Sequence, residues 1–341
     1  MKILFDNDTG IDDALALVYL LSQAQAELVS VASTPGNVSA DQVARNNLAL
    51  LQLCGSPGVP VAVGADGPLE IPLVTTPETH GPQGLGYAEL PVPRGQLQDA
   101  GAVDLWVDAV RRHPGELTAL ITAPLTNFAL ALRKEPDLPR LLKRTVIMGG
   151  SYFYQGNTTP TAEWNTHVDP HAAAEVFAAF EGEPLERLPV VCALEMTERI
   201  EMHPGHLERL AREAGCAEPE LVLPDDPAGR RSTASVPLVR VLSDALRFYF
   251  EFHRHYGQGY VAHVHDVFAA AVALDTVEYR TRPATVHVET RPGPLVGTTV
   301  ADYRGLWGRE PNARIVSWND PPAVFDEVIG SIAALARRLS G

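Results

Sequence analysis

Cysteine is scarce in this sequence, and the few cysteines lie far apart. Cys54, Cys192 and Cys216 are odd in number and form no CxxC pair, so neither a disulfide framework nor a zinc cage is implied. This usage is typical of a reducing compartment, and we expect a cytoplasmic protein. Only Ile3–Phe5 forms an apolar run before the first aspartate. That run is too short for a secretory signal, so we expect no leader.

Long apolar runs and an excess of positive charge are also missing. No stretch approaches the roughly 18 uninterrupted apolar residues that a membrane-spanning helix needs, so we expect no membrane partner. The chain has 27 Lys and Arg against 42 Asp and Glu, a net charge of −15. Nucleic acid is therefore not an expected partner, because polyphosphate binders need clustered Lys and Arg. Most of the excess acid is expected on solvated surface.

What the chain does contain is an ordinary globular composition of 341 residues, 45% of them apolar, in which short apolar runs alternate with helical patterns. The predicted strands are Ile3–Phe5, Glu27–Ser33, Leu117–Thr122, Arg144–Met148, Leu188–Cys192, Ala284–Thr290 and Thr298–Val300. The predicted helices are Asp12–Gln23, Ala40–Cys54, Leu125–Leu132, Asp169–Phe180, Val236–His255 and Pro321–Leu339. This alternation predicts an α/β fold with a mostly parallel open sheet, helices on both faces and a Rossmann-like core. Ligands bind such sheets at the carboxyl ends of the strands.

One segment interrupts this alternation. Residues 221–235, LVLPDDPAGRRSTAS, are rich in proline, glycine and charge and predict a surface loop insertion. No internal repeat and no low-complexity linker divides the chain. We therefore expect residues 1–341 to form a single domain.

The strongest local feature is an acidic turn after the first predicted strand. Asp6, Asp8, Asp12 and Asp13 fall within eight residues, where a buried strand gives way to a helix. Such carboxylates repel one another, and a cation usually relieves the repulsion. Hard oxygen ligands in a flexible turn suit calcium or magnesium better than zinc. Gly10 permits the sharp turn.

Simpler interpretations of the acidic turn explain less of it. Helix capping accounts for Asp12 and Asp13, because carboxylates are favourable at a helix N-terminus, but it leaves the other two acids unexplained. An EF-hand loop needs glycine and glutamate where this sequence has Ile11 and Leu17.

A third interpretation is a magnesium-dependent phosphohydrolase of the haloacid-dehalogenase type, whose DxDx[TV] turn resembles residues 6–9. That enzyme needs a downstream lysine and a later acidic pair after a strand. Lys143 is a weak candidate for the lysine, and no convincing acidic pair follows.

Further motifs follow the acidic turn in order along the chain. They are Thr34–Asn37 (TPGN), Thr79–Leu85 (THGPQGL), Thr122–Asn127 (TAPLTN), Met148–Gly150 (MGG), Gly156–Asn165 (GNTTPTAEWN), Asp169-Pro170 and His265-Asp266. Together with the acidic turn, which looks like a DxDxGxDDA signature, this series resembles the inosine-uridine preferring nucleoside hydrolases. The resemblance runs from residue 3 to the final helix. It implies the nucleoside-hydrolase-like fold and a calcium-dependent enzyme that cleaves ribonucleosides.

The resemblance implies a calcium site made of oxygen donors. Its ligands are the carboxylates of Asp8, Asp13 and Asp266 and the backbone carbonyl of Thr122, and oxygen is the donor that calcium prefers. Asp266 is the informative ligand, because only folding brings a residue more than 250 positions away to the acidic turn. Without the other motifs, the His265-Asp266 pair reads as a local helix cap.

The resemblance also assigns contacts to the ribose hydroxyls, which need both donors and acceptors. The ribose-contacting residues are Asp12, Asn37, Asn157, Glu163 and Asn165. Each of the three asparagines alone could be an ordinary turn residue. Trp164 is expected to form a wall of the sugar pocket.

The implied reaction is hydrolysis at C1′ of the ribose through an oxocarbenium-like state. Water activated by the metal gives its proton to Asp8, the general base. His265 is the candidate acid for the departing base, because histidine can carry a proton near neutral pH. A histidine at this place, and Pro82-Gln83 rather than tryptophan after His80, indicate the broad inosine-uridine group.

The residues at the base end are less certain from the sequence. His80 fits two roles, ordering of its loop and direct contact with the base. Tyr249, His253 and Tyr256 lie on one face of a helix, where such a stripe more often packs the core than contacts a ligand. The sequence leaves both interpretations open for these residues.

The hypothesis is a calcium-dependent nucleoside N-ribohydrolase that converts purine or pyrimidine ribonucleosides to ribose and free base. The departures Thr9 for proline, Ala123 for glycine and Glu195 for aspartate put the substrate preference in doubt. The alternatives are the magnesium-dependent phosphohydrolase and a catalytically silent nucleoside-binding protein. A homodimer or homotetramer is expected by analogy only.

Overall fold

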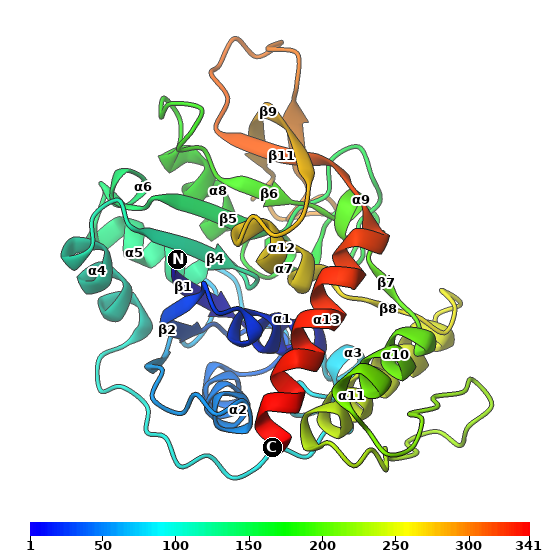
Figure 1. Ribbon diagram of the computed structural model, residues 1–341. Coiled ribbons are helices and arrows are strands. Elements are labelled where there is room, and N and C mark those ends of the chain that lie inside the picture. Colours follow the sequence, from blue (N-terminus) through cyan, green and yellow to red (C-terminus); the bar gives the residue numbers. More distant parts are fainter.

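The computed structural model describes residues 1–341 and contains one large sheet with helices around it (Figure 1). The strands are β1 Lys2–Asn7, β2 Glu27–Ser33, β3 Val61–Val63, β4 Leu117–Ile121, β5 Arg144–Met148, β6 Val190–Cys192, β7 Glu201–Met202, β8 Ala262–His263, β9 Tyr279–Val288, β10 Thr299–Asp302 and β11 Ala313–Asn319. The helices are α1 Ile11–Ser22, α2 Ala40–Leu53, α3 Pro77–His80, α4 Ala102–Arg112, α5 Thr126–Lys134, α6 Leu138–Leu141, α7 Trp164–Val168, α8 Pro170–Ala179, α9 Leu194–Thr197, α10 Pro204–Ala214, α11 Pro237–His255, α12 His265–Ala273 and α13 Pro321–Ser340.

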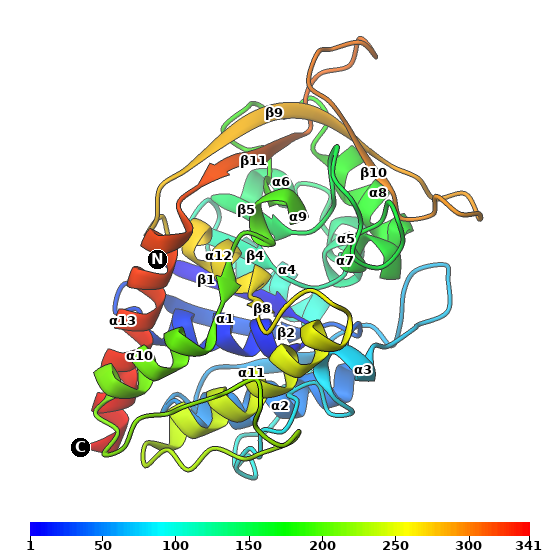
Figure 2. The same cartoon turned by 90° about the vertical axis from the view of Figure 1, so that its right-hand side faces the viewer.

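The main sheet has nine strands in the order β10-β9-β11-β6-β5-β4-β1-β2-β3. Every pair from β3 across to β11 is parallel, and β9 pairs antiparallel with both β10 and β11. The long β9 arches over β11 at one end of the molecule (Figure 2). The predicted mostly parallel open sheet is confirmed.

Alternating side chains of β1 show why both faces of the sheet are covered. Ile3 and Phe5 belong to a core shared with α1, α2, α11, α12 and α13, whereas Leu4 belongs to a second core with α4, α5 and α8. Successive strand residues point to opposite faces, so an apolar run such as Ile3–Phe5 needs helices on both sides. The predicted helices on both faces are confirmed.

The strand order reverses at β1. From β1 the chain builds β2 and β3 on one side and then β4, β5 and β6 on the other. This arrangement leaves a crevice beyond the carboxyl ends of β1 and β4, the usual ligand site in open α/β sheets. The acidic turn follows β1, and Thr122 follows β4.

Several elements differ from the sequence prediction. β9 begins at Tyr279 rather than Ala284, and β11 was not predicted. Arg280 lies over the Trp318 ring of β11, and Arg282 lies over Tyr303, so charged residues of β9 pack on aromatic faces instead of ending the strand. α4, α10 and α12 were also missed.

Residues 221–235 contain no helix or strand, and most of them are exposed. None of the helices combines the length and apolar character needed to cross a bilayer.

Candidate active site

A pocket of about 490 Å³ lies at the carboxyl ends of β1, β4 and β5. Every site residue predicted from the sequence, apart from Asp13, lines it. These residues are Asp8, Asp12, Asn37, His80, Thr122, Asn157, Glu163, Trp164, Asn165, Tyr249, His265 and Asp266. No lysine or arginine lines the pocket. The fold therefore brings motifs from the whole chain into one acidic cavity.

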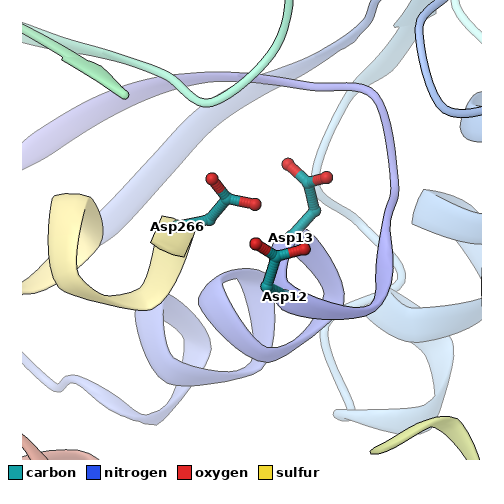
Figure 3. Close-up of side chains that lie close together, drawn as sticks. All are labelled: Asp12, Asp13 and Asp266. Carbon is teal, nitrogen blue, oxygen red and sulfur yellow. The ribbon is translucent and has the colours of Figure 1, made fainter. Parts of the chain in front are cut away.

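Asp12, Asp13 and Asp266 form a tight carboxylate cluster, with one oxygen of each within 4.8 Å of the others. Figure 3 shows Asp12 and Asp13 at the start of α1 and Asp266 opposite them at the start of α12. Asp13 lies just outside the pocket lining, but its carboxylate completes the cluster. The prediction grouped Asp8 with Asp13 and Asp266, whereas the three carboxylates that all approach one another are those of Asp12, Asp13 and Asp266. Asp8 lies beside Asp13, and its Oδ2 accepts a hydrogen bond from the Asn37 amide at 2.9 Å.

Asp13 combines a capping role with its place in the cluster. Its Oδ2 accepts from the Gly10 amide at 2.7 Å, at the N-terminus of α1. Its Oδ1 accepts from the Thr122 hydroxyl at 2.6 Å. The capping interpretation of the acidic turn is thus correct for Asp13, and the same bonds fix this carboxylate beside Asp266.

The donor set fits a hard divalent cation. Asp8, Asp12, Asp13 and Asp266 are all buried, and the donors that reach Asp8 and Asp13 are neutral amides and a hydroxyl. The Thr122 carbonyl accepts one bond, from Asn165 Nδ2 at 2.9 Å, which leaves a second lone pair free. Buried carboxylates without a positive partner are costly unless they are protonated or bind a metal.

Burial perturbs the titration of this cluster in the absence of a metal. Desolvation, followed by the charge of Asp13, raises the pKa of Asp8 well above the ordinary range. The same two causes raise the pKa of Asp12 to about 7. Desolvation raises the pKa of Asp13 to about 6. Desolvation, and then Asp12, raise the pKa of Asp266 well above its ordinary value. Without a cation the cluster would therefore retain protons that a bound cation displaces.

We expect the metal-free protein to lose stability as the pH rises. Asp12 and Asp13 hold protons in the folded state up to about pH 6–7, while the unfolded chain releases them near pH 4, so this stability is complete below pH 4 and is lost toward pH 7. The thermal midpoint of the chelator-treated protein should decrease as the pH is raised from about 5 to about 7.5. Adding a divalent cation should restore the midpoint only at the higher pH. Scanning calorimetry checks this, and a rising midpoint would contradict it.

The residues assigned to ribose also hold the local backbone. Glu163 caps α7: its carboxylate accepts from the amides of Asn165 and Thr166 at 2.7 and 3.0 Å, and it also accepts from Gly150 at 2.9 Å. Asn157 Oδ1 accepts from the Trp164 amide at 3.0 Å. Turn and cap roles therefore coexist with positions in the pocket wall, and the ribose roles stay predictions.

Asn37 and Gly36 connect the second strand to the acidic turn. Asn37 Oδ1 is buried without a hydrogen-bond partner and lines the pocket, so it is free to accept from a ligand hydroxyl. A Cβ on Gly36 would lie 2.1 Å from Asp8 Oδ2. Glycine is thus required for the approach of Asp8 to the Asn37 amide.

Gly36→Ala should displace the Asp8 carboxylate and lower the turnover rate by about 100-fold, the usual effect of an error of about 1 Å in a catalytic group. Gly58→Ala is the matched control, because nothing lies within 4 Å of a Cβ there. Steady-state kinetics of both variants test the prediction. Equal activity of the two would show that the Gly36–Asp8 contact does not matter.

The pocket wall also carries imidazole and phenol rings. His265 Nδ1 lies 2.8 Å from the Thr197 hydroxyl. Burial, and then the neighbouring imidazoles, lower the pKa of His265 well below its ordinary value. Once protonated, this imidazole is therefore a strong acid. His263 lies beside it, with ring centroids 5.9 Å apart.

His80 and Tyr249 each hold local structure and also line the pocket. His80 Nδ1 accepts from the Ile11 amide at 3.1 Å, which ties its loop to the start of α1, and the ring also lines the pocket. Burial lowers the pKa of His80 to about 3. Tyr249 packs in the core and lines the pocket, 5.0 Å from the His80 ring.

Comparison with known proteins decides the family. The sequence profile described as "Inosine-uridine preferring nucleoside hydrolase" matches residues 3–326. The chain belongs to this family. A pyrimidine-specific ribonucleoside hydrolase, RihA, of Citrobacter koseri is 35% identical over 318 residues, 93% of each chain. The predicted hydrolase acting on the N-glycosyl bond of ribonucleosides is confirmed at the level of the family.

Solved structures agree with this assignment. A purine-preferring ribonucleoside hydrolase from Gardnerella vaginalis superposes on this nucleoside hydrolase with a TM-score of 0.86 and 27% identity, over 99% of this chain and 100% of the other. An inosine-uridine preferring nucleoside hydrolase from Bacillus anthracis, at 21% identity and a TM-score of 0.71 over 99% of both chains, shares the fold.

Some pocket residues of this nucleoside hydrolase were missed from the sequence. Glu198, Gln258 and His263 line the pocket, yet none lies in a motif of the ordered series. His263 could have been noticed two residues before His265. Gln258 lies in the loop after α11, where the sequence carries no comparable signal.

Proposed function

We propose that this nucleoside hydrolase is calcium-dependent and prefers pyrimidine ribonucleosides, which it converts to ribose and free base. One observation carries the proposal: a buried carboxylate cluster without a positive partner, in a pocket whose wall also carries several imidazoles. The pyrimidine preference is supported by relatives at 35% identity that are named as pyrimidine-specific. The purine-preferring structure is more distant, at 27%.

Calcium would be held by the carboxylates of Asp8, Asp13 and Asp266 and by the carbonyl of Thr122. When bound, the cation supplies a Lewis acid that makes water a stronger acid and a better nucleophile. Calcium rather than magnesium is supported by the number of carboxylate oxygens gathered here, since magnesium usually keeps several waters and few protein ligands. Asp12 belongs to the same tight cluster and is assigned to the ribose hydroxyls.

The chain's own groups move the protons. Asp8 takes a proton from the attacking water at its carboxylate, and the Asn37 amide that donates to Oδ2 holds that carboxylate in place. The ribose is oriented by Asn37, Asn157, Glu163 and Asn165, and Trp164 forms a wall. The nearby carboxylates stabilise positive charge as it develops on the ring.

The departing base leaves at the imidazole end of the pocket. His265 delivers a proton to it, with Nδ1 oriented by the Thr197 hydroxyl. His80 and Tyr249 form the wall beside the base. The raised pKa of Tyr249, caused first by burial and then by the Asp12 charge, keeps its hydroxyl protonated and able to donate.

The two alternatives fit the site less well. A phosphohydrolase of this type needs a lysine beside the phosphate as well as its magnesium, and no lysine or arginine lines the pocket. Lys143 is exposed and precedes β5, at the opposite end of the strand from the pocket. A silent binding protein needs neither the buried base Asp8 nor the acid His265.

We further propose that residues 1–341 form a single domain with residues 221–235 as a surface loop, and that the protein is cytoplasmic, which its three free cysteines support. A homodimer or homotetramer is supported by exposed apolar side chains such as Phe153, Leu306 and Trp307. Light scattering after gel filtration measures the assembly. A monomer at micromolar concentration would contradict it.

The substrate preference is tested with uridine, cytidine, inosine and adenosine as substrates for the calcium-loaded enzyme. We expect kcat/KM for both pyrimidine nucleosides to exceed that for both purine nucleosides by about tenfold or more, in the range that pocket shape can provide. A purine nucleoside as best substrate would contradict the preference but not the hydrolase activity. No reducing sugar from any of the four would contradict both.

A further inference from the structure

The loop of residues 221–235 is attached to one face of α11. A loop of this length without regular structure is unusual unless it has a role. Four residues of α11 form hydrogen bonds or ion pairs with the loop: Asp244, Arg247, Glu251 and Arg254. Their spacing of three and four places them on one face of the helix.

The centre of this attachment is a buried ion pair. Arg247 Nη1 lies 2.9 Å from Asp226 Oδ2, with only 2% and 6% of the two side chains exposed. A bond from the Leu223 amide, and then the Arg247 guanidinium, lower the pKa of Asp226 to about 2. The aspartate therefore stays charged, and it bonds its own loop as well as the helix.

Further bonds flank the ion pair on both sides. Asp244 accepts from the Ser232 amide at 2.6 Å and from Arg231 Nε at 3.0 Å. Glu251 accepts from the Gly229 amide at 3.2 Å and from the Tyr87 hydroxyl at 2.6 Å. The loop is thus held along about three turns of α11.

The opposite face of α11 lines the pocket. Tyr249, Phe252, His253 and Tyr256 all belong to the pocket wall, at about 140–240° around the helix from Arg247 when each residue advances by about 100°. Because a helix moves as a stiff unit, whatever holds one face sets the position of the other.

The residues assigned to the metal and the ribose lie on elements other than this helix. Asp8 follows β1, Thr122 follows β4 and Glu163 caps α7. These elements belong to the central sheet or contact it directly, and their bonds run among themselves. α11 reaches this part of the pocket by packing on α1 and through the contact between Tyr249 and His80, whose Nδ1 accepts a hydrogen bond from the Ile11 amide.

We infer that Arg247 and Asp226 are positioning residues that hold α11 in place through the 221–235 loop and so set the base end of the pocket, with a smaller effect on the ribose end. The inference rests on the proposed function, because it takes the α11 end to receive the base. Neither residue touches the substrate. Both act through the rings of Tyr249 and His253.

The test compares Arg247→Met with Arg230→Met in the calcium-loaded enzyme. Arg230 bonds the same Asp226 but is 57% exposed and does not lie on α11, so it is a matched control. For Arg247→Met we expect KM for uridine to rise by about tenfold or more, because the base-end rings are misplaced. Inhibition by free ribose, which occupies only the carboxylate end, should change by less than about twofold. Arg230→Met should match the wild type in both.

A second variant and a second measurement cover the case in which the lone Arg247→Met change unfolds the protein. Arg247→Met/Asp226→Asn removes both charges together, which buried pairs tolerate better than the loss of one partner. Amide hydrogen exchange of residues 237–255, measured without substrate, should accelerate in both variants but not in Arg230→Met.

The outcomes distinguish a failure of the positioning role of Arg247 from a failure of the proposed function. Unchanged KM and unchanged exchange in Arg247→Met would overturn the inference, and so would equal losses in uridine and ribose binding. If the wild type cleaves no nucleoside, the proposed function fails, while the exchange comparison still decides whether Arg247 braces α11.

Discussion

Asp8→Asn is expected to lower kcat for uridine by about 10²–10⁴-fold, the range associated with loss of a general base. The amide has nearly the same shape and can still accept from the Asn37 amide through its oxygen. It cannot take a proton from water, and it is a poorer ligand for the metal. The measurement is release of reducing sugar at saturating uridine and saturating calcium, so that weakened metal binding does not limit the rate.

Two controls separate the loss of the base from loss of structure. Asp41→Asn, an exposed aspartate at the start of α2, should leave kcat unchanged. The thermal midpoint of metal-free Asp8→Asn should equal or exceed that of the wild type near neutral pH, because asparagine removes the cost of burying a carboxyl group whose pKa desolvation raises well above its ordinary value. A kcat within about threefold of the wild type would remove Asp8 from the catalytic role.

His265→Gln should show a loss that depends on the leaving group. With uridine we expect kcat to fall by about 10²–10³-fold, because the departing base no longer receives a proton. With p-nitrophenyl β-D-riboside the loss should be less than about tenfold, because p-nitrophenolate leaves without protonation. Glutamine keeps a polar side chain near the Thr197 hydroxyl, so the fold around α12 should be retained.

The role of His265 is decided by the ratio between the loss of kcat with uridine and the loss with p-nitrophenyl β-D-riboside. His203→Gln is the control, since that half-exposed histidine at the start of α10 lies outside the pocket. Equal losses on the two substrates would assign His265 a structural role instead of an acid role. A loss confined to uridine would support its assignment as the acid.

Local sequence patterns predicted the parallel half of the fold well. Glu27–Ser33 and Arg144–Met148 are observed with the predicted bounds, because buried parallel strands are short apolar runs between clear breaks. β11 was missed because its residues Ala313–Asn319 mix apolar and polar side chains. Its parallel partner β6 is distant in sequence, and its other partner β9 is antiparallel. The segment is a strand because of these pairings and not because of its own side-chain pattern.

The site shows the same division between local and distant information. Ordered motifs named many of the residues that line the pocket, including Asp266, which lies far along the chain, but not Glu198, Gln258 or His263. They did not predict that Asp12 joins Asp13 and Asp266 in the carboxylate cluster. Nor did they predict the hydrogen bond between Asp8 and the Asn37 amide, a contact between two loops that no single segment encodes.

The attachment of the 221–235 loop to α11 could not be predicted from the sequence either. Residues 221–235 have the composition of a loop, and Arg247 looks like an ordinary charged residue on an amphipathic helix. Only the folded chain shows that Arg247 is buried and paired with Asp226. Long-range polar pairs of this kind leave no periodic signal.

The most direct test of the central claim is reducing-sugar release from uridine before chelation, after chelation and after calcium is added back. We predict that release is lost when the metal is removed and returns with calcium, and that phosphate monoesters release no phosphate in any of the three conditions. Undiminished release from protein shown by elemental analysis to be free of metal would contradict a metal-dependent reaction at the cluster of Asp12, Asp13 and Asp266.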